Sequence, residues 1–307
     1  MARILVTGGC GFIGSHLVEA LMKLRQLVVV VDNLSTGRRS NLPSRCRLIK
    51  ADIRSERLMD IFRQVRPEYV FHLAAQKSVF RSIVEPVVDA DTNILGSLQV
   101  LEAARRFRIK RIIFASTGGA IYGPTSRLRT PESTSPQPTS PYGLAKWTIE
   151  QYLTLFTELY RLPSVALRLA NVYGPRQDPI GEAGVIAIFL RRLKLRQPLI
   201  IHGTGRQTCD FLFVGDAVRA FLTAWRRHAS GVLNVGTGRQ TSILRLVRQL
   251  QRLSGWRLSP RHRAAIPGEV VRSALHIGRL QRTLGWSPRV LLSEGLRQTW
   301  QWEMANA

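Results

Sequence analysis

The sequence is poor in cysteine, and the few cysteines follow no ligand spacing. Its 307 residues include three of them, Cys10, Cys46 and Cys209. An odd number at wide, irregular intervals matches neither a disulfide framework nor a zinc site. We therefore expect unpaired thiols, no metal centre and a reducing compartment, the cytoplasm.

Long apolar stretches are also absent. No window of 18 or more apolar residues occurs that would cross a bilayer. The first residues, MARILVTGG, run directly into a strand-like segment without the charged, apolar and small-residue layout of a signal peptide. With 45% hydrophobic and 21% charged residues, the composition is typical of a globular protein with no membrane partner.

Acidic side chains and lysines are scarce, whereas arginine is abundant. Six lysines and 39 arginines stand against 20 acids, so the formal net charge is +25. Such an excess suits a polyanionic partner, namely nucleic acid, anionic lipid or a phosphorylated substrate. The alternative is an arginine-rich composition spread over solvated helix faces. Because no aromatic residues interleave the arginines as in single-strand binders, we favour this alternative and predict no nucleic-acid partner.

The first two-thirds of the chain alternates strand-like and helix-like segments. Each strand candidate is short and apolar and ends in a polar or glycine-rich loop, which is typical of strands buried on both faces. Amphipathic stretches of helix length lie between them, for example 13–24 and 93–107. The alternation predicts an α/β fold with a parallel sheet between helices. The strand candidates are 3–7, 27–31, 48–51, 69–73, 111–115 and 164–169.

A glycine-rich turn follows the first strand candidate. The run ILVTGGCGFIGSHL places Gly8, Gly11 and Gly14 between a strand and a helix, and Asp32 ends the next strand. This is the fingerprint of a dinucleotide site, because the glycines let the backbone approach a pyrophosphate at a helix N-terminus. Asp32 would accept hydrogen bonds from the adenosine ribose and repel a 2′-phosphate, so we predict NAD rather than NADP. Two arginines a few residues later weaken that preference.

The character of the sequence changes after residue 171. An irregular segment follows, and the later helices carry much of the arginine excess. We expect residues 1–171 to form the NAD-binding domain, with 211–236 returning to it. Residues 172–210 and 237–307 would form a smaller C-terminal α/β domain on the substrate side. The loop at 124–141, rich in Pro, Ser and Thr, is long enough to serve the site.

Six motifs carry a family resemblance. They are TGGCGFIG, DNLSTG (32–37), HLAAQ (72–76), ASTGGAIYG (115–123), SPYGLAK (140–146) and NVYGPRQDP (171–179). Together they resemble the NAD-dependent epimerase/dehydratase family of extended short-chain dehydrogenases/reductases, which implies a Rossmann-type doubly wound parallel sheet. Within the family the chain most resembles UDP-glucose 4-epimerases, and the likeness runs over nearly the whole sequence.

The resemblance implies that Thr117, Tyr142 and Lys146 are the catalytic residues. Tyr142 and Lys146 lie one helical turn apart, and an ammonium beside a phenol of pKa about 10 favours the phenolate. As the base, Tyr142 would take the proton of a sugar 4-hydroxyl while the C4 hydride passes to NAD. Return of the hydride to the other face of the 4-keto sugar would complete the epimerisation and regenerate NAD.

The same resemblance assigns the cofactor contacts to the glycine turn and to segments that follow the strands. Asp32 and its neighbours would hold the adenosine, whereas the segment around Lys77 and the helix at Asn93 would lie near the nicotinamide side. The cofactor-binding residues implied are Gly8, Gly11, Phe12, Ile13, Gly14, Asp32, Asn33, Ser35, Thr36, Gly37, Asp52, Ile53, Leu73, Ala74, Ala75, Gln76, Lys77, Asn93, Ala115, Ser116, Tyr142, Lys146 and Ala170.

Substrate contacts are implied on the catalytic residues and on the second half of the chain. Asn171 matches a position that hydrogen-bonds the nucleotide in relatives. His202 stands where relatives often stack an aromatic ring near the uracil, or it is a half-buried histidine with a partner inside the protein. The sequence leaves both interpretations open. The substrate-binding residues implied are Thr117, Tyr142, Asn171, Val185, Ile201, His202, Arg206 and Arg272.

The substrate half departs from the family at two positions. Cys209, in GTGRQTCDF, stands where relatives have an arginine that holds the nucleotide diphosphate, and Ile266 stands where a second arginine would precede PGE. Neither side chain reproduces the bidentate contact of arginine with phosphate. Either other arginines hold the diphosphate or the substrate has changed. The arginines available nearby are Arg206, Arg261, Arg263 and Arg272.

Three functions therefore stay open. The first is a UDP-galactose/UDP-glucose 4-epimerase that acts as a homodimer, paired through the helices at 93–107 and 142–160 as in relatives. No carboxylate follows Thr117 directly, where dehydrating or decarboxylating relatives carry one, so a dehydratase is disfavoured. The second is an epimerase or reductase for a different nucleotide- or phospho-sugar. The third is an NAD-containing protein that binds polyanions.

Overall fold

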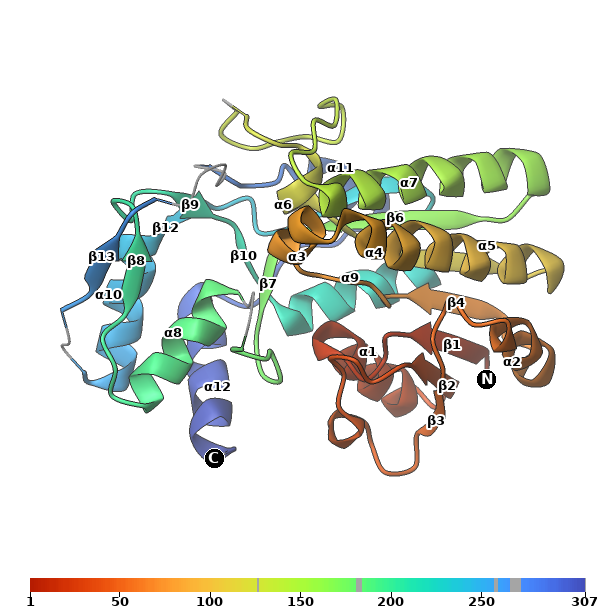
Figure 1. Cartoon of the computed structure of the whole chain (residues 1–307), viewed down its shortest axis with the longest axis horizontal. Coiled ribbons are helices and arrows are strands. Elements are labelled where there is room, and N and C mark those ends of the chain that lie inside the picture. Colours follow the sequence, from red (N-terminus) through yellow and green to blue (C-terminus); the bar gives the residue numbers. More distant parts are fainter. Residues whose placement is uncertain (126, 181–183, 257–258, 266–271, 307) are drawn as a thin grey trace.

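The computed structural model describes residues 1–125, 127–180, 184–256, 259–265 and 272–306. A sheet flanked by helices forms the larger part of the molecule, and a smaller lobe made from later residues lies beside it (Figure 1). In the described ranges, no helix is long and apolar enough to cross a membrane.

Seven strands within the described residues form the central sheet. They are β1 (Arg3–Thr7), β2 (Leu27–Asp32), β3 (Arg47–Lys50), β4 (Tyr69–His72), β5 (Arg111–Thr117), β6 (Ser164–Leu169) and β11 (Gly231–Val235). All neighbours are parallel, in the order β3-β2-β1-β4-β5-β6-β11. β6 is buried along its whole length, although its sequence SVALRL includes the polar residues Ser164 and Arg168. The predicted doubly wound Rossmann-type sheet is confirmed.

The strand order reverses between β1 and β4. β1 pairs with β2 on one side and with β4 on the other. Loops that leave the two central strands therefore diverge at the carboxyl edge of the sheet, where folds of this kind bind their ligands. The glycine turn after β1 and the HLAAQ segment at the end of β4 both lie there.

Two layers of helices cover the sheet (Figure 1). α1 (Phe12–Lys23) and α9 (Val214–Arg226) pack against each other on one face. On the other face lie α2 (Arg57–Val65), α5 (Gly96–Arg106) and α7 (Pro141–Tyr160). Each layer buries its apolar side chains in a separate core. The strands are thereby shielded from water on both sides.

Two boundaries differ from the sequence prediction by more than one residue. β5 continues through Thr117, because its backbone pairing with β6 extends over Ser116 and Thr117. The helix expected at 93–107 begins with a π-helical turn, η2 (Asp91–Leu95), before α5. Turns of this kind occur often at functional sites. The remaining short helices of the large part are η1 (Arg39–Asn41), α3 (Val79–Val84), α4 (Pro86–Ala90) and α6 (Gly118–Ile121).

The smaller lobe combines short strand pairs with helices. β7 pairs with β10 and β8 with β13 in parallel, whereas β9 and β12 are antiparallel. The strands are β7 (Asn171–Tyr173), β8 (Ile200–His202), β9 (Thr208–Cys209), β10 (Phe211–Phe213), β12 (Thr241–Ser242) and β13 (Arg261–Arg263). The helices are α8 (Val185–Lys194), α10 (Ile243–Ser254) and α12 (Leu292–Ala305), whereas α11 (Gly278–Leu284) packs against β11 of the large sheet.

The chain crosses between the two parts more than once. β11 extends the large sheet beside β6, and α9 packs against α1. These contacts place much of 211–236 with the large part. The division into 1–171 with 211–236, and 172–210 with 237–307, stays a prediction.

Candidate active site

The turn between β1 and α1 is shaped for an anion. Gly8 has a φ of +70°, and a Cβ there would lie 2.6 Å from the backbone nitrogen of Ala74. A Cβ on Gly14 would collide with the carbonyl oxygen of Gly8. α1 begins without a side-chain cap and without an acid in its first turn, at Gly11 and Phe12. Its first N–H groups therefore suit the pyrophosphate of a dinucleotide.

Asp32 ends β2 beside this turn. Its buried carboxylate accepts backbone N–H bonds from Cys10 (2.9 Å) and Leu34 (2.8 Å). A Cβ on Gly37 would lie 2.8 Å from the Cβ of Cys10, so the segment 33–37 lies against the glycine turn. An ionised carboxylate has about four acceptor sites, so the oriented Asp32 can still accept ribose hydroxyls.

A second carboxylate, that of Asp52, lies beside Asn33 in the region predicted to hold the adenosine. Asp52 accepts a hydrogen bond from Asn33 Nδ2 (2.8 Å) and two from the guanidinium of Arg54 (2.8 and 2.9 Å). These bonds, with that of Arg54 first, hold the pKa of Asp52 well below its usual range. Arg54 also pairs with Asp91 on η2 (2.6 Å). Ile53, which precedes Arg54, is buried. A Cβ on Gly96, the first residue of α5, would lie 2.8 Å from Ile53 Cδ1.

The segment 73–77 after β4 is clamped by buried amides. Asn93 accepts the backbone N–H of Gln76 and donates to its carbonyl oxygen, both at 2.9 Å. Asp89 accepts from Asn93 Nδ2 (2.8 Å) and from Gln76 Nε2 (2.9 Å). Burial raises the pKa of Asp89, and its Oδ2 has no hydrogen-bond partner in the part of the chain that the structure describes.

Thr117 and Tyr142 lie at the starts of two helices, α6 and α7, that pack together. Thr117 ends β5 and caps α6, since its Oγ1 accepts the N–H of Ala120 (3.3 Å). The first turn of α7, which carries Tyr142, packs closely on α6: a Cβ on Gly143 would collide with the carbonyl oxygen of Ala120. The hydroxyl groups expected to act on the sugar thus come from two packed elements at the carboxyl end of β5.

Lys146 is buried on α7, one turn after Tyr142. Its Nζ donates to the carbonyl oxygen of Ala115 (3.1 Å) and lies 5.9 Å from the centre of the Tyr142 ring. Burial lowers the pKa of Lys146 to about 8, against the opposing charges of Asp89 and Glu150. At neutral pH the lysine remains a cation, placed to favour the Tyr142 phenolate.

A buried ion pair lies one further turn along α7. Arg168 on β6 contacts Glu150 with Nη2 2.6 Å from Oε2, and both side chains are at most 5% exposed. Ser116 on β5 donates to the other carboxylate oxygen (2.5 Å). The guanidinium of Arg168 also lies 4.8 Å from the centre of the Tyr122 ring. These contacts fix the helix that carries Tyr142 to the two strands beneath it.

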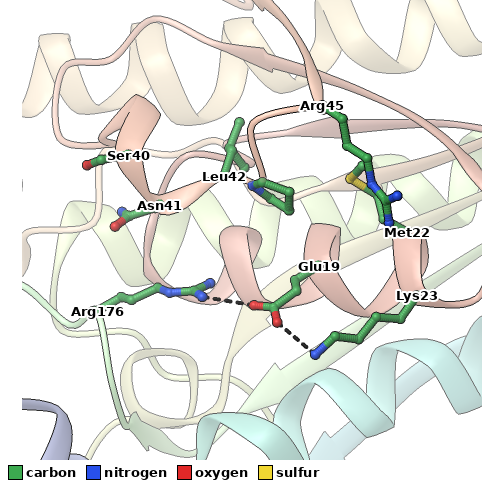
Figure 2. Close-up of a pocket in the computed structure, with 9 residues that line it drawn as sticks. Glu19, Met22, Lys23, Ser40, Asn41, Leu42, Arg45 and Arg176 are labelled. Carbon is green, nitrogen blue, oxygen red and sulfur yellow. Dashed lines mark hydrogen bonds and ion pairs between the residues drawn. The ribbon is translucent and has the colours of Figure 1, made fainter.

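The loop after β7 is fastened to α1. Arg176, at a φ of +68°, donates to Glu19 (2.8 Å), which also pairs with Lys23 (2.8 Å) (Figure 2). His16 Nε2 lies 2.9 Å from the carbonyl oxygen of Pro175. A cavity of about 380 Å³ separates this ion pair from the segment 40–45. The loop therefore joins the smaller lobe to the helix of the glycine turn.

The residues predicted at the substrate side lie at the junction and in the smaller lobe. Asn171 is exposed at the start of β7, and Val185 begins α8. Ala170, which was predicted at the cofactor, is buried between β6 and β7. Ile201 on β8 is 1% exposed and packs in the hydrophobic core, and its substrate contact stays a prediction. His202 Nδ1 lies 3.2 Å from a backbone carbonyl oxygen, which gives the histidine a partner inside the protein.

A cation lies next to Cys209. Arg272 forms a parallel bridge with Thr208, the residue before Cys209 on β9. Arg272 is exposed, and so is Arg206 on the turn before β9. The other replaced position, Ile266, lies outside the described residues.

Sequence reasoning missed the buried polar groups behind the site. Glu150 had one detectable signal, because it follows Lys146 by four positions and so shares its face of α7. Asp89 and Ser97 each bond Asn93, four positions away, and also partners 13 and 25 positions away. His72 and Arg168 bond only residues that are distant in the sequence. Across the described ranges, no group of three His, Cys, Asp or Glu side chains could hold a metal ion. The missed residues are His72, Asp89, Ser97, Glu150 and Arg168.

Residues 4–236 match the family model described as the NAD dependent epimerase/dehydratase family. The match includes the glycine turn, the clamped segment after β4 and the Thr117, Tyr142 and Lys146 group. The chain belongs to this family. It is an enzyme, and NAD is its cofactor.

Similar proteins match almost the entire chain. The UDP-glucose 4-epimerase of Mycolicibacterium smegmatis is 41% identical over 303 residues, 97% of each sequence. The structure of Thermotoga maritima UDP-glucose 4-epimerase with UDP-glucose has a TM-score of 0.97 and 46% identity, covering 98% of both chains. That of Thermus thermophilus UDP-glucose 4-epimerase with NAD has a TM-score of 0.94 and 40% identity, covering 99% of this chain and 100% of that one. These likenesses support a nucleotide-sugar epimerase.

Proposed function

We propose that the protein is a UDP-galactose/UDP-glucose 4-epimerase. The observation that carries the proposal is the buried Lys146 beside Tyr142, with Thr117 at the end of the adjoining strand. The similar proteins that bear this activity in their names support the choice of sugar.

The chemistry follows from the positions of three side chains. Tyr142 takes the proton of the sugar 4-hydroxyl and later returns it, because the ammonium of Lys146 favours its phenolate. Thr117 Oγ1 holds the same sugar hydroxyl in line with Tyr142. The glycine turn, Asp32 and segment 73–77 would hold NAD, which would supply a reversible hydride acceptor for C4. Inversion requires that the sugar present its other face before the hydride returns.

The space beside Thr117 suits an epimerase better than a dehydratase. A Cβ on Gly119 would find its nearest neighbour, Thr117 Oγ1, 3.9 Å away, so the backbone is uncrowded there. The two residues after Thr117 are glycines and supply no acid or base for elimination at neighbouring carbons. The bare backbone of Gly119 also leaves room for a sugar to turn, whereas Gly118 packs against Leu275.

We assign the diphosphate contact that Cys209 cannot make to Arg272. The backbone of Arg272 forms a bridge with that of Thr208, the residue before Cys209, and Arg272 is exposed. The side chain of Arg272 therefore leaves the backbone one residue away from the position of Cys209. Two further arginines on β13, Arg261 and Arg263, pair with β8 next to His202. The small lobe thus offers several guanidinium groups for the phosphates.

We also propose a homodimer in the cytoplasm. Apolar side chains are exposed on α3, α4, α5 and α7 or just before them, and these helices lie side by side on one flank of the molecule (Figure 1). Such a patch on a monomer is a typical interaction surface. Its exposed members include Ile83, Val84, Val87, Leu95, Leu144, Leu155 and Leu159.

The activity is tested by a coupled assay for conversion of UDP-galactose to UDP-glucose with added NAD. Tyr142→Phe is expected to lower kcat by about 10²–10⁴-fold, because it removes the acid–base group and little else. Tyr152→Phe, on the same helix but outside the site, is the matched control and should retain activity. If the wild type binds NAD but converts neither UDP-hexose, the substrate has changed and other sugar nucleotides must be screened.

The role of Arg272 is tested in the same assay. Arg272→Leu is expected to raise the KM for the UDP-sugar about tenfold or more, because a charge-assisted phosphate contact is lost. Arg252→Leu, an exposed position on α10 with the same charge change, is the control. Equal KM values for the two variants would reject Arg272 as the diphosphate ligand.

A further inference from the structure

A chain of buried hydrogen bonds lies beneath the cofactor side of the sheet. Thr7, the last residue of β1, has its Oγ1 2.7 Å from Nδ1 of His72, the last residue of β4. Nε2 of His72 lies 2.9 Å from Oγ of Ser97 in the first turn of α5. All three side chains are at most 2% exposed, so water cannot replace these partners.

The bonds at the two ends of this hydrogen-bond series fix the direction of every bond within it. The Ser97 hydroxyl donates to the carbonyl oxygen of Asn93 (2.6 Å), so it must accept from His72 Nε2. Nε2 therefore carries the proton, and Nδ1 accepts from the hydroxyl of Thr7. Thr7 Oγ1 in turn accepts the backbone N–H of Ala74 (3.3 Å). A single neutral tautomer of the imidazole satisfies every member of the chain.

The environment supports a neutral imidazole. Burial first, and then the charge of Lys146, lower the pKa of His72 to about 3. The ring also lies 5.5 Å from the Phe114 ring, which gives it an apolar neighbour. A protonated ring would donate from both nitrogens, and the Thr7 hydroxyl would then lose its acceptor.

Both ends of this hydrogen-bond series reach segment 73–77, which is predicted to face the cofactor. At one end Ala74 donates to Thr7. At the other end Asn93, whose carbonyl oxygen accepts from Ser97, clamps the backbone of Gln76 from both sides. The segment 73–77 is thus held at two points by a structure that His72 connects.

We propose that His72, as an Nε2-protonated neutral imidazole, is a positioning residue that fixes segment 73–77 for NAD. It acts through Thr7 and Ser97 and touches neither sugar nor reacting atoms. The backbone pairing of β1 with β4 does not depend on the His72 side chain. Loss of that side chain should therefore disturb segment 73–77 more than the sheet. The proposal rests on the family's cofactor and not on the identity of the sugar.

The affinity for NAD tests the proposal. Ser97→Ala leaves His72 Nε2–H without an acceptor, and we expect it to raise the Kd for NAD about tenfold, as measured by calorimetry on protein stripped of cofactor. Ser164→Ala is the matched control. The buried Ser164 hydroxyl also has two partners, Thr157 Oγ1 (3.0 Å) and the Leu153 carbonyl (3.3 Å), but it lies at the start of β6, away from the carboxyl edge of the sheet. The control is expected to lower Tm comparably but to leave the Kd unchanged. A Kd that does not change in Ser97→Ala would overturn the proposal.

The tautomer can be read on the wild type, without any variant. In protein labelled with ¹⁵N-histidine, His72 is assigned through its contact with the Phe114 ring. We expect a protonated Nε2 and an unprotonated Nδ1 from about pH 5 to pH 8, a range in which an ordinary histidine titrates. A ring that titrates in this range, or that carries its proton on Nδ1, would contradict the proposed hydrogen-bond order. Because no sugar is present in either experiment, the result is independent of the epimerase assay.

Discussion

The buried position of Lys146 beside Tyr142 comes at a cost to stability. The pKa of this lysine is about 8 in the folded chain against a reference value of 10.5. Below pH 8 both folded and unfolded chains bind the proton. Between about pH 8 and pH 10.5 the unfolded chain binds more protons, so this group makes the free energy of unfolding rise with pH. At pH 7 the charged, buried lysine therefore destabilises the fold.

Replacement of Lys146 by methionine separates the two effects. Lys146→Met should abolish turnover, because the cation beside Tyr142 is gone. In cofactor-free protein at pH 7 its free energy of unfolding should exceed that of the wild type by about 1–3 kcal/mol. The excess should shrink toward pH 10, where the wild-type lysine is neutral.

Urea unfolding at pH 7 and pH 9.5 checks this expectation. The exposed Lys50→Met on β3 is the control for a general loss of charge. If Lys146→Met were less stable than the wild type at both pH values by the same amount, the buried lysine would not be the source of the pH dependence.

Residues with a local signal could be predicted from the sequence, and residues without one could not. Tyr142 and Lys146 are four positions apart, so a helix brings them to one face whatever the rest of the chain does. His72 owes its role to Thr7 and Ser97, 65 and 25 residues away. Such contacts arise only when β1, β4 and α5 are placed side by side.

At the level of elements, the sequence predicted the strands well because their apolar runs are bounded by polar turns. The end of β5 was set too early, because Ser116 and Thr117 look like loop residues. In the folded chain the ladder with β6 continues past them, and the Ser116 hydroxyl is satisfied by Glu150. The π-helical turn at η2 was not predicted, because one extra residue per turn leaves no clear trace in a hydrophobic pattern.

The η2 turn has a consequence for the site. Asn93 lies within it, and its side chain faces the Gln76 backbone while its carbonyl accepts from Ser97. A π-helical turn shifts the side chains that follow it relative to a regular helix. The element therefore combines two tasks, support of segment 73–77 and continuation into the surface helix α5.

For the whole molecule, the excess of arginine bears on assembly as well as on ligands. Many acids are already paired, for example Asp52 with Arg54 and Glu150 with Arg168. The net charge of +25 therefore comes from arginines that acids cannot match in number. Like charges on two copies repel each other at low salt. An apolar surface on α3, α4, α5 and α7 acts in the opposite direction.

These opposing forces predict an unusual salt dependence of the proposed homodimer. Added salt screens the repulsion between copies, whose range is about 10 Å at 0.1 M ionic strength, and leaves apolar contacts intact. The dissociation constant of the dimer, measured by sedimentation velocity, should therefore fall as salt rises from about 0.05 M to 0.5 M. Val87→Glu, at a position 79% exposed on α4, should shift the protein to monomer. Leu128→Glu, 69% exposed in the loop before α7, should leave the dimer intact. A monomer at every salt concentration, or equal effects of the two substitutions, would show that the helical flank is not the interface.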